Sequence, residues 1–158
     1  MEFDFLVPID NEIIDYKNHL SSQHIGGVMA LHTDDAFPDL SEVKIALVGV
    51  LENRGDEGVA TVVDLTSVRK SLYGLFMGNW KMGIADLGDI LAGNSTMDTY
   101  FAVKKVVASL IKKGIVPIVI GGSQDLTYAL YRAYDELEQM VNLVAIDNKF
   151  DFGKETDR

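Results

Sequence analysis

Short apolar runs that alternate with amphipathic stretches are the main pattern along the chain. Four of these runs predict β-strands, at residues 44–51, 84–87, 115–120 and 141–146. The last two are apolar almost throughout, which favours parallel strands covered on both faces over strands with one face in water. Pro117 cannot donate a ladder hydrogen bond, so it is tolerable only near the entrance of its strand.

Between the strands, apolar residues recur at spacings of three and four, which predicts amphipathic helices. We expect three of them, at residues 64–76, 96–113 and 125–139. The second carries signals at both ends, with Thr96 as N-cap, Lys112 and Lys113 in the last turn and Gly114 just beyond it. This alternation predicts βαβ units with right-handed crossovers and helices on both faces of the sheet.

The first 43 residues carry a weaker pattern, in which residues 10–20 predict a helix and residues 21–38 a loop. The sequence has no internal repeat, low-complexity tract or linker. We therefore expect one α/β domain over residues 1–158, with three α/β/α layers and a mostly parallel, doubly wound sheet.

The composition excludes some classes of partner. The 158 residues are 47% hydrophobic and 24% charged, which is typical of a globular chain. A formal charge of -10 argues against nucleic acid or an anionic membrane as the main partner, because both are negatively charged. The chain has no cysteine, and its first five residues (MEFDF) lack the basic start of a signal peptide, so we expect a cytoplasmic protein.

In a parallel α/β sheet, ligands bind at the carboxyl ends of the strands. In this chain we expect those ends to be the loops at residues 52–59, 121–125 and 147–153. The second loop reads Gly-Gly-Ser-Gln-Asp and opens a helix, so paired glycines permit a tight turn and free N–H groups could hold an anion. The alternative is an ordinary turn in which Ser123 or Asp125 caps the helix. Ser123 as a nucleophile lacks a following histidine to act as base.

The third loop carries two carboxylates, Asp147 and Asp151, four residues apart. Side chains that leave a strand end at this spacing can converge on a hard divalent cation, although aspartates are also common in ordinary loops. The three histidines, His19, His24 and His32, all precede the first long strand. We interpret them as surface or packing residues.

In order and spacing, these segments resemble the ureohydrolases, the family of arginase, agmatinase and formimidoylglutamase. That family has Gly-Gly-x-His at one strand end and Asp-x-His-x-Asp at the next. The matching segments are Ile118–Gln124, Val144–Asp151, Val48–Gly58, Val68–Arg69 and Asp86–Ile90. The resemblance covers roughly residues 44–153 and implies an arginase-like fold, present here only in part because the family's second acidic motif would lie beyond residue 158.

The resemblance also implies two manganese ions that activate a shared hydroxide for hydrolysis of a guanidino or formimino group. Asp147 and Asp151 match metal-ligand positions, whereas Gln124 and Lys149 replace the two histidines. An amide is a poor substitute for imidazole, and a protonated lysine has no lone pair to offer. We therefore expect manganese to be absent or weakly bound.

Three hypotheses remain open from the sequence, and one of them is a purely structural fragment that aggregates unless a partner covers its open sheet edge. The leading hypothesis is a ureohydrolase-like domain with a degraded metal site that is inactive or weakly active and serves as a binding or oligomerisation module, with a homo-oligomer expected. The alternative is an active hydrolase of formiminoglutamate, arginine, agmatine or a related small cationic or amidine-bearing substrate. In that case the resemblance places Asn53 and Gly55 on the substrate side of the site.

Overall fold

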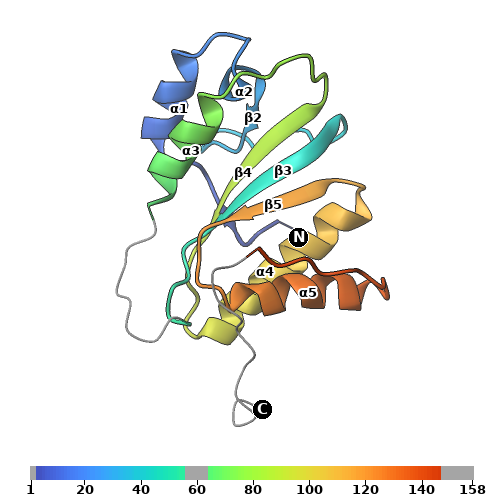
Figure 1. Cartoon of the computed structure of the whole chain (residues 1–158). Coiled ribbons are helices and arrows are strands. Elements are labelled where there is room, and N and C mark those ends of the chain that lie inside the picture. The colour runs from blue at the N-terminus through green and yellow to red at the C-terminus, as the bar shows by residue number, and fades with distance from the viewer. Residues whose placement is uncertain (1–2, 56–63, 147–158) are drawn as a thin grey trace.

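The computed structural model describes residues 3–55 and 64–146, and its centre is a mixed sheet (Figure 1). Three parallel strands, β4 (Gly83–Ile90), β3 (Val43–Val50) and β5 (Val116–Ile120), lie side by side in that order. Two short strands also pair with β4: β1 (Leu6–Val7) is antiparallel to it and β2 (Ala30–Leu31) parallel. The sheet is therefore mostly parallel, as expected.

The chain winds in both directions from β3. It reaches β4 through α3 (Leu65–Tyr73), and then passes through α4 (Thr96–Lys112) to β5 on the other side of β3. Three helices complete the layers: α1 (Asn11–Asn18), α2 (Ile25–Val28) and α5 (Leu126–Glu136). Figure 1 shows α1, α2 and α3 together on one face, with α4 and α5 on the other. This arrangement confirms the doubly wound fold class.

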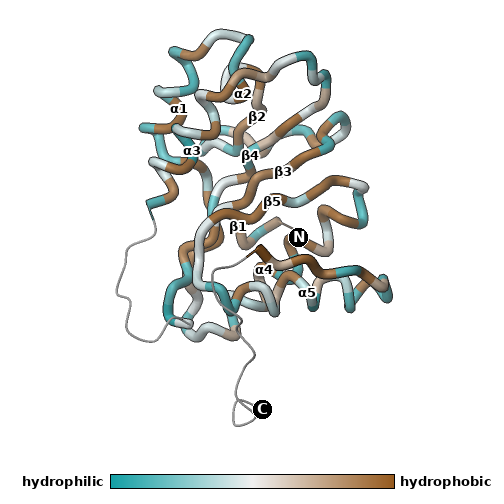
Figure 2. Tube along the Cα trace, in the orientation of Figure 1, coloured by the Kyte–Doolittle hydropathy of each residue, from teal (hydrophilic) through white to brown (hydrophobic). Residues whose placement is uncertain are grey.

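Each face of the sheet has its own apolar core. On the α4 side, Val48 and Val50 of β3 pack with Val103 and Val107 of α4. On the other side, a smaller cluster joins the sheet to α1 and α3. In Figure 2 the hydrophobic colour follows the central strands, and in β3 residues 46–50 are buried, which is typical of a strand covered on both faces. The same prediction for β5 is wrong, because Val116 and Ile118 are 59% and 43% exposed.

An ion-paired network fixes α3 on β4; we call Arg69, Tyr73, Asp86 and Asp89 the buried network. Asp86 has no exposed surface and accepts hydrogen bonds from Arg69 Nε at 2.8 Å and the Tyr73 hydroxyl at 2.8 Å. Arg69 Nη2 also pairs with Asp89 Oδ1 at 2.8 Å. A β-carbon at Gly49 would overlap the Asp89 carboxylate, so glycine in β3 leaves room for the network.

The helix ends show which local signals were correct. Gly114 follows α4 with a φ of +72°, the left-handed geometry expected of a C′ glycine. Asp10, placed inside the expected helix by the sequence pattern, is instead the N-cap of α1. The prediction that Thr96 caps α4 is wrong. Ser95 is the cap, because its side chain accepts from the Asp98 N–H while the Asp98 carboxylate accepts from the Ser95 N–H.

Two further predictions are wrong. Residues 141–146 form no strand, and the side chains of Val144 and Ile146 are 82% and 99% exposed. An apolar run makes a strand only when a neighbouring strand accepts its hydrogen bonds, and within the described residues this run pairs with none. Residues 21–38 are not all loop, since they contain α2 and β2. Among the described residues, no helix has the length and apolar content that crossing a bilayer requires.

Candidate functional site at the carboxyl edge of the sheet

The loops that follow β3, β4 and β5 meet at the carboxyl edge of the sheet. Since the chain turns opposite ways from β3, this edge contains the topological switch point, where ligands of doubly wound folds bind. The loop after β3 continues alongside β4, with the Leu51 N–H donating to the Ile90 carbonyl at 2.9 Å. The edge is therefore held by hydrogen bonds as well as by the strands.

A buried glutamate organises this edge; we call Glu52, Arg54 and Thr99 the carboxylate clamp. Glu52 has no exposed surface and accepts from Arg54 Nε at 2.9 Å, Arg54 Nη2 at 2.6 Å and the Thr99 hydroxyl at 2.7 Å. The Arg54 guanidinium also donates to the carbonyls of Gly93 at 2.8 Å and Asn94 at 3.1 Å. The clamp thereby joins the loop after β3 to the loop after β4 and to the first turn of α4.

The charges of the clamp are well matched. The side-chain hydrogen bonds from Arg54 lower the pKa of Glu52 to about 2, against the opposing effect of burial, with smaller contributions from the Arg54 N–H and Thr99. Glu52 is therefore ionised at neutral pH although it is buried. The Arg54 side chain remains 41% exposed, so part of the guanidinium faces solvent at the edge.

The loop after β5 is bound to the same glutamate through its backbone. The Ser123 N–H donates to the Glu52 carbonyl at 2.8 Å, and Ser123 itself is buried. Gly121 and Gly122 adopt φ values of +81° and +78°, which confirms that the glycine pair makes a tight turn. A β-carbon at Gly122 would also overlap the Leu126 side chain. Two consecutive glycines are thus required where β5 turns into α5.

Asp125 connects this loop to its neighbours. Its carboxylate accepts a hydrogen bond from the Tyr100 hydroxyl of α4. A β-carbon at Gly55 would overlap the Asp125 carboxyl group, so the loop after β3 passes directly against it. Asp125 occupies the N-cap position of α5 but makes no side-chain capping bond, and the Ser123 hydroxyl is directed to the Glu52 carbonyl at 3.4 Å. Neither side chain caps α5 in the way the sequence suggested.

The structure places three of the predicted site residues at this edge. Asn53 and Gly55 lie in the loop after β3, and Gln124 lies, exposed, in the turn that opens α5. The contact of Gly55 with Asp125 brings these two loops together. The remaining predicted residues, Asp147, Lys149 and Asp151, lie outside the described residues.

All three histidines are engaged elsewhere. His19 contacts the Asp15 carbonyl at 2.7 Å, His24 stacks on Phe76 with ring centroids 4.6 Å apart, and His32 contacts the Leu87 carbonyl at 2.9 Å. Within residues 3–55 and 64–146, no three histidine, cysteine or acidic side chains gather in a way that could hold a metal ion.

A family model described as the arginase family matches residues 61–158, more than half of the sequence and including the loops after β4 and β5. The chain belongs to the arginase family. Its structure is similar to the crystal structure of agmatine ureohydrolase of Thermoplasma volcanium, with a TM-score of 0.52 and 21% sequence identity. No curated relative matches the chain.

The match to that structure covers 76% of this chain and 41% of the agmatine ureohydrolase chain. This arginase-family chain therefore shares part of the ureohydrolase fold, namely the mixed sheet with its flanking helices. Members of the family generally bind manganese.

Sequence reasoning missed the residues that hold the edge together. Glu52 and Thr99 were not among the predicted site residues, and Arg54 was noted only as part of a loop motif. The available signal was a glutamate directly after an apolar strand with an arginine two residues later, because a carboxylate at such a position must be paired when it is buried. The partner Thr99 is 47 residues away in sequence, and no local pattern identifies it.

Proposed function

We propose that this chain is a ureohydrolase-like domain whose binuclear metal site is degraded, and that it acts as a binding or oligomerisation module with little or no hydrolase activity. The observation that carries this proposal is the replacement of both motif histidines, by Gln124 at the end of β5 and by Lys149 between Asp147 and Asp151. Membership of the arginase family supports the comparison with those motif positions.

Gln124 is a poor replacement for a histidine ligand. Its position in the turn that opens α5 suits a side chain directed at a site beyond the sheet edge. Its amide oxygen is a neutral donor, whereas transition metals such as manganese are well held by imidazole together with carboxylate. The replacement therefore weakens one ligand position without adding charge.

Lys149 has a larger effect because it adds a positive charge. A unit charge about 4 Å from another costs roughly 4 kcal/mol at an effective dielectric constant near 20, and each manganese ion carries two charges. The ammonium group can neutralise the aspartates on either side of it in place of a metal. Asp147, Lys149 and Asp151 lie outside the described residues, and their roles are inferred from their positions in the family motif.

Manganese content measured on the purified full chain tests the proposal. After equilibration with manganese and removal of excess, wild type should retain far less than one ion per chain by elemental analysis. The Gln124→His/Lys149→His variant restores the motif and should bind manganese at least roughly tenfold more tightly, because an opposing charge is removed and two donors are gained. Addition of Asp147→Asn and Asp151→Asn to that variant is the matched control and should abolish the gain. Stoichiometric manganese in wild type that depends on Asp147 and Asp151 would refute the proposal.

The second candidate is an active manganese-dependent hydrolase of a guanidino or formimino bond. It is favoured by the retained carboxylates Asp147 and Asp151 and by the similarity in fold to an agmatine ureohydrolase. Release of urea, ammonia or formamide from arginine, agmatine and formiminoglutamate, with manganese added, distinguishes the two candidates. Turnover that is lost in Asp147→Asn would favour the hydrolase, and no turnover on any of the three substrates would count against it.

A further inference from the structure

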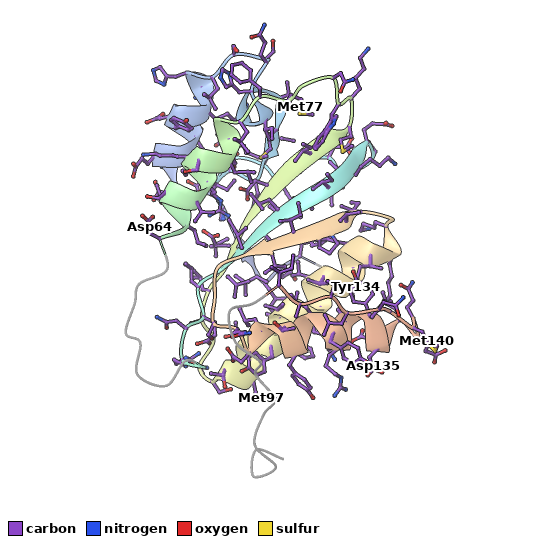
Figure 3. All side chains as sticks on the ribbon, in the orientation of Figure 1. Asp64, Met77, Met97, Tyr134, Asp135 and Met140 are labelled. Carbon is purple, nitrogen blue, oxygen red and sulfur yellow. The ribbon has the colours of Figure 1, made fainter. Side chains whose placement is uncertain are left out.

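The outer side of α4 and α5 carries aromatic rings and positive charges together. We call Met97, Phe101, Lys104, Lys105, Tyr128 and Arg132 the basic aromatic face. Two shallow grooves meet at Phe101, one between α4 and α5 and the other along the opposite side of α4. The rings of Phe101 and Tyr128 are 50% and 53% exposed, and Met97, labelled at the start of α4 in Figure 3, is 63% exposed.

Cations lie over the exposed rings of this face. Lys104 Nζ and Lys105 Nζ are 5.7 and 5.6 Å from the centre of the Phe101 ring, and the Arg132 guanidinium is 5.7 Å from that of Tyr128. The rings and the cations therefore form one surface, so a partner that binds here meets apolar area and positive charge together.

The net charge of this surface is positive, whereas that of the whole chain is negative. The two grooves are lined by four cations and one carboxylate, whereas the chain has 24 acidic and 14 basic residues. That carboxylate, Glu136, is shared between Lys104 at 3.1 Å and Lys105 at 2.8 Å, so it neutralises only one of them. Arg132 pairs with Asp135 beside the groove at 3.3 Å, and both side chains are exposed, so four cations face two carboxylates and the surface keeps a net positive charge. Such a face repels an identical face and attracts an acidic surface.

An acidic surface with the matching features exists on the same chain; we call residues 34–42 the acidic segment. Its four carboxylates, Asp34, Asp35, Asp39 and Glu42, are exposed, and it contains no basic residue. Phe37, in the middle of the segment, is 38% exposed. The segment therefore offers an aromatic side chain among four carboxylates, with Lys113 as the one lysine that lines the same pocket as Phe37.

The acidic segment is held in place before any partner binds. The backbones of Thr33 and Ala36 exchange hydrogen bonds of 3.0 and 3.3 Å, and the Phe37 ring stacks on Phe3 with ring centroids 5.3 Å apart. It precedes β3 and so lies at the amino edge of the sheet, whereas α4 starts at the carboxyl edge (Figure 1). The segment lies beside Phe3 and Lys113 at the C-terminal end of α4, and Phe5 packs on Phe101 of the basic aromatic face with ring centroids 6.0 Å apart. The two surfaces are therefore distinct but close, and a preformed loop costs little entropy to dock.

We propose that copies of this chain associate head to tail, with the acidic segment of one copy docked on the basic aromatic face of the next. The carboxylates of the segment pair with Lys104, Lys105 and Arg132, and Phe37 packs against Phe101 and Tyr128. Such a contact joins two different surfaces, so it closes into a dimer when it is made twice between the same two copies, and otherwise forms a ring or a filament. It supplies a contact for the oligomerisation role proposed above, and its test measures association alone, so its failure leaves the manganese test unaffected.

Sedimentation velocity over a range of concentrations tests this proposal on the full chain. The mean mass of wild type should rise with concentration and fall as salt is added, since screening weakens contacts between exposed charges. Lys104→Glu/Arg132→Glu and Asp34→Lys/Asp35→Lys should each weaken association at least roughly tenfold. The Lys17→Glu/Lys81→Glu variant makes the same change in net charge elsewhere and should associate as wild type does.

Mixing of the two charge-reversed proteins is the decisive measurement. Each retains one surface that fits the other protein, so the mixture should recover association that neither shows alone. A monomeric wild type at every concentration, no recovery in the mixture, or a segment variant that associates normally would each overturn the proposal. Far-UV circular dichroism establishes that both proteins are folded, and Phe37→Ser, which removes a partly exposed ring, gives a second route to the same loss.

Discussion

The pairs Arg69–Asp86 and Arg54–Glu52 each contain a carboxylate without exposed surface, but the two arginine side chains differ in their exposure to water. In the buried network the Arg69 side chain is only 3% exposed, and in the carboxylate clamp the Arg54 side chain is 41% exposed. The buried network joins one helix to one strand. The clamp joins the loops after β3 and β4, and the Ser123 N–H brings in the loop after β5.

The difference in exposure determines what happens when a carboxylate is removed. A guanidinium left without its partner in a dry site keeps the full cost of a buried charge, whereas one near the surface turns toward water. The buried network therefore contributes mainly to the stability of the fold, and the clamp mainly to the shape of the carboxyl edge.

Asp86→Asn should have the largest effect. It removes the charge that faces Arg69 Nε at 2.8 Å and disturbs the bond from the Tyr73 hydroxyl at 2.8 Å. Loss of one partner of a buried pair costs about 3–5 kcal/mol, and urea denaturation should show a fall of this size in the free energy of unfolding.

Asp39→Asn is the matched control for that measurement, because Asp39 is an exposed aspartate that accepts hydrogen bonds from the N–H and hydroxyl of Ser41 and has no buried charge facing it in these contacts. This variant should change the free energy of unfolding by at most roughly 0.5 kcal/mol. A loss below about 1 kcal/mol in Asp86→Asn would show that Asp89 alone satisfies Arg69 and would remove the contrast with the clamp.

Glu52→Gln should lower the free energy of unfolding by less than Asp86→Asn does, by roughly 2 kcal/mol at neutral pH, because the partly exposed Arg54 can be hydrated instead. The loss should depend on pH. The pKa of Glu52 lies near 2 in the folded state and near its ordinary value of 4.5 in the unfolded state, so its contribution is present above pH 4.5 and is lost as the pH falls toward 2. The stability difference between wild type and Glu52→Gln should therefore narrow over this range.

Glu12→Gln removes a surface ion pair to Lys70 and is the control, with an expected effect of at most about 0.5 kcal/mol. Hydrogen exchange adds a second measurement. Glu52→Gln should speed exchange at the Arg54 and Ser123 amides and leave α3 unchanged. A uniform increase over the whole sheet would contradict the assignment of the clamp to the carboxyl edge.

The same comparison shows where sequence reasoning succeeds. Four helices (α1, α3, α4 and α5) and the long strands were predicted because their apolar spacing is local, whereas α2, with four residues, was missed. The glycine pair at residues 121 and 122 was recognised because a left-handed turn needs such residues. β4 was recognised only over residues 84–87 although it runs to Ile90. Asp86 and Asp89 interrupt its apolar pattern, and only the position of Arg69 in space explains why they are tolerated.

The remaining errors also concern contacts between distant residues. β1 and β2 have two residues each, too few to show a period, and both exist through pairing with β4. Residues 141–146 have the composition of a strand but no partner strand among the described residues. At the candidate site, the sequence predicted the loops after β3 and β5, and missed the loop after β4 as well as Glu52 and Thr99, whose bond spans 47 positions. The third expected loop, at residues 147–153, lies outside the described residues.

Tyr73→Phe tests the buried network at high pH. Burial, and then the charge of Asp86, raise the pKa of the Tyr73 hydroxyl well above its ordinary value of 10. The folded chain therefore keeps this proton when the unfolded chain loses it, and the stability that it contributes is lost as the pH rises above 10, by up to about 1.4 kcal/mol per pH unit. At neutral pH the free energy of unfolding of wild type should exceed that of Tyr73→Phe by roughly 1.5 kcal/mol, and this difference should disappear above pH 10. A constant gap up to pH 11 would contradict the assigned bond.

Ser95→Ala should have the smallest effect and tests whether the clamp depends on the start of α4. Ser95 follows Asn94, whose carbonyl accepts from Arg54 at 3.1 Å, and its hydroxyl accepts from the Asp98 N–H at 3.3 Å. Loss of this cap should cost about 1 kcal/mol in urea denaturation and speed hydrogen exchange in the first turn of α4, with no change in α3. Thr96→Ala alters the residue that the sequence pattern favoured as the cap, and should cost less than about 0.5 kcal/mol. If the two variants were equally destabilising, the cap would not fix the first turn, and the position of Thr99 against Glu52 would depend on the core packing of α4 alone.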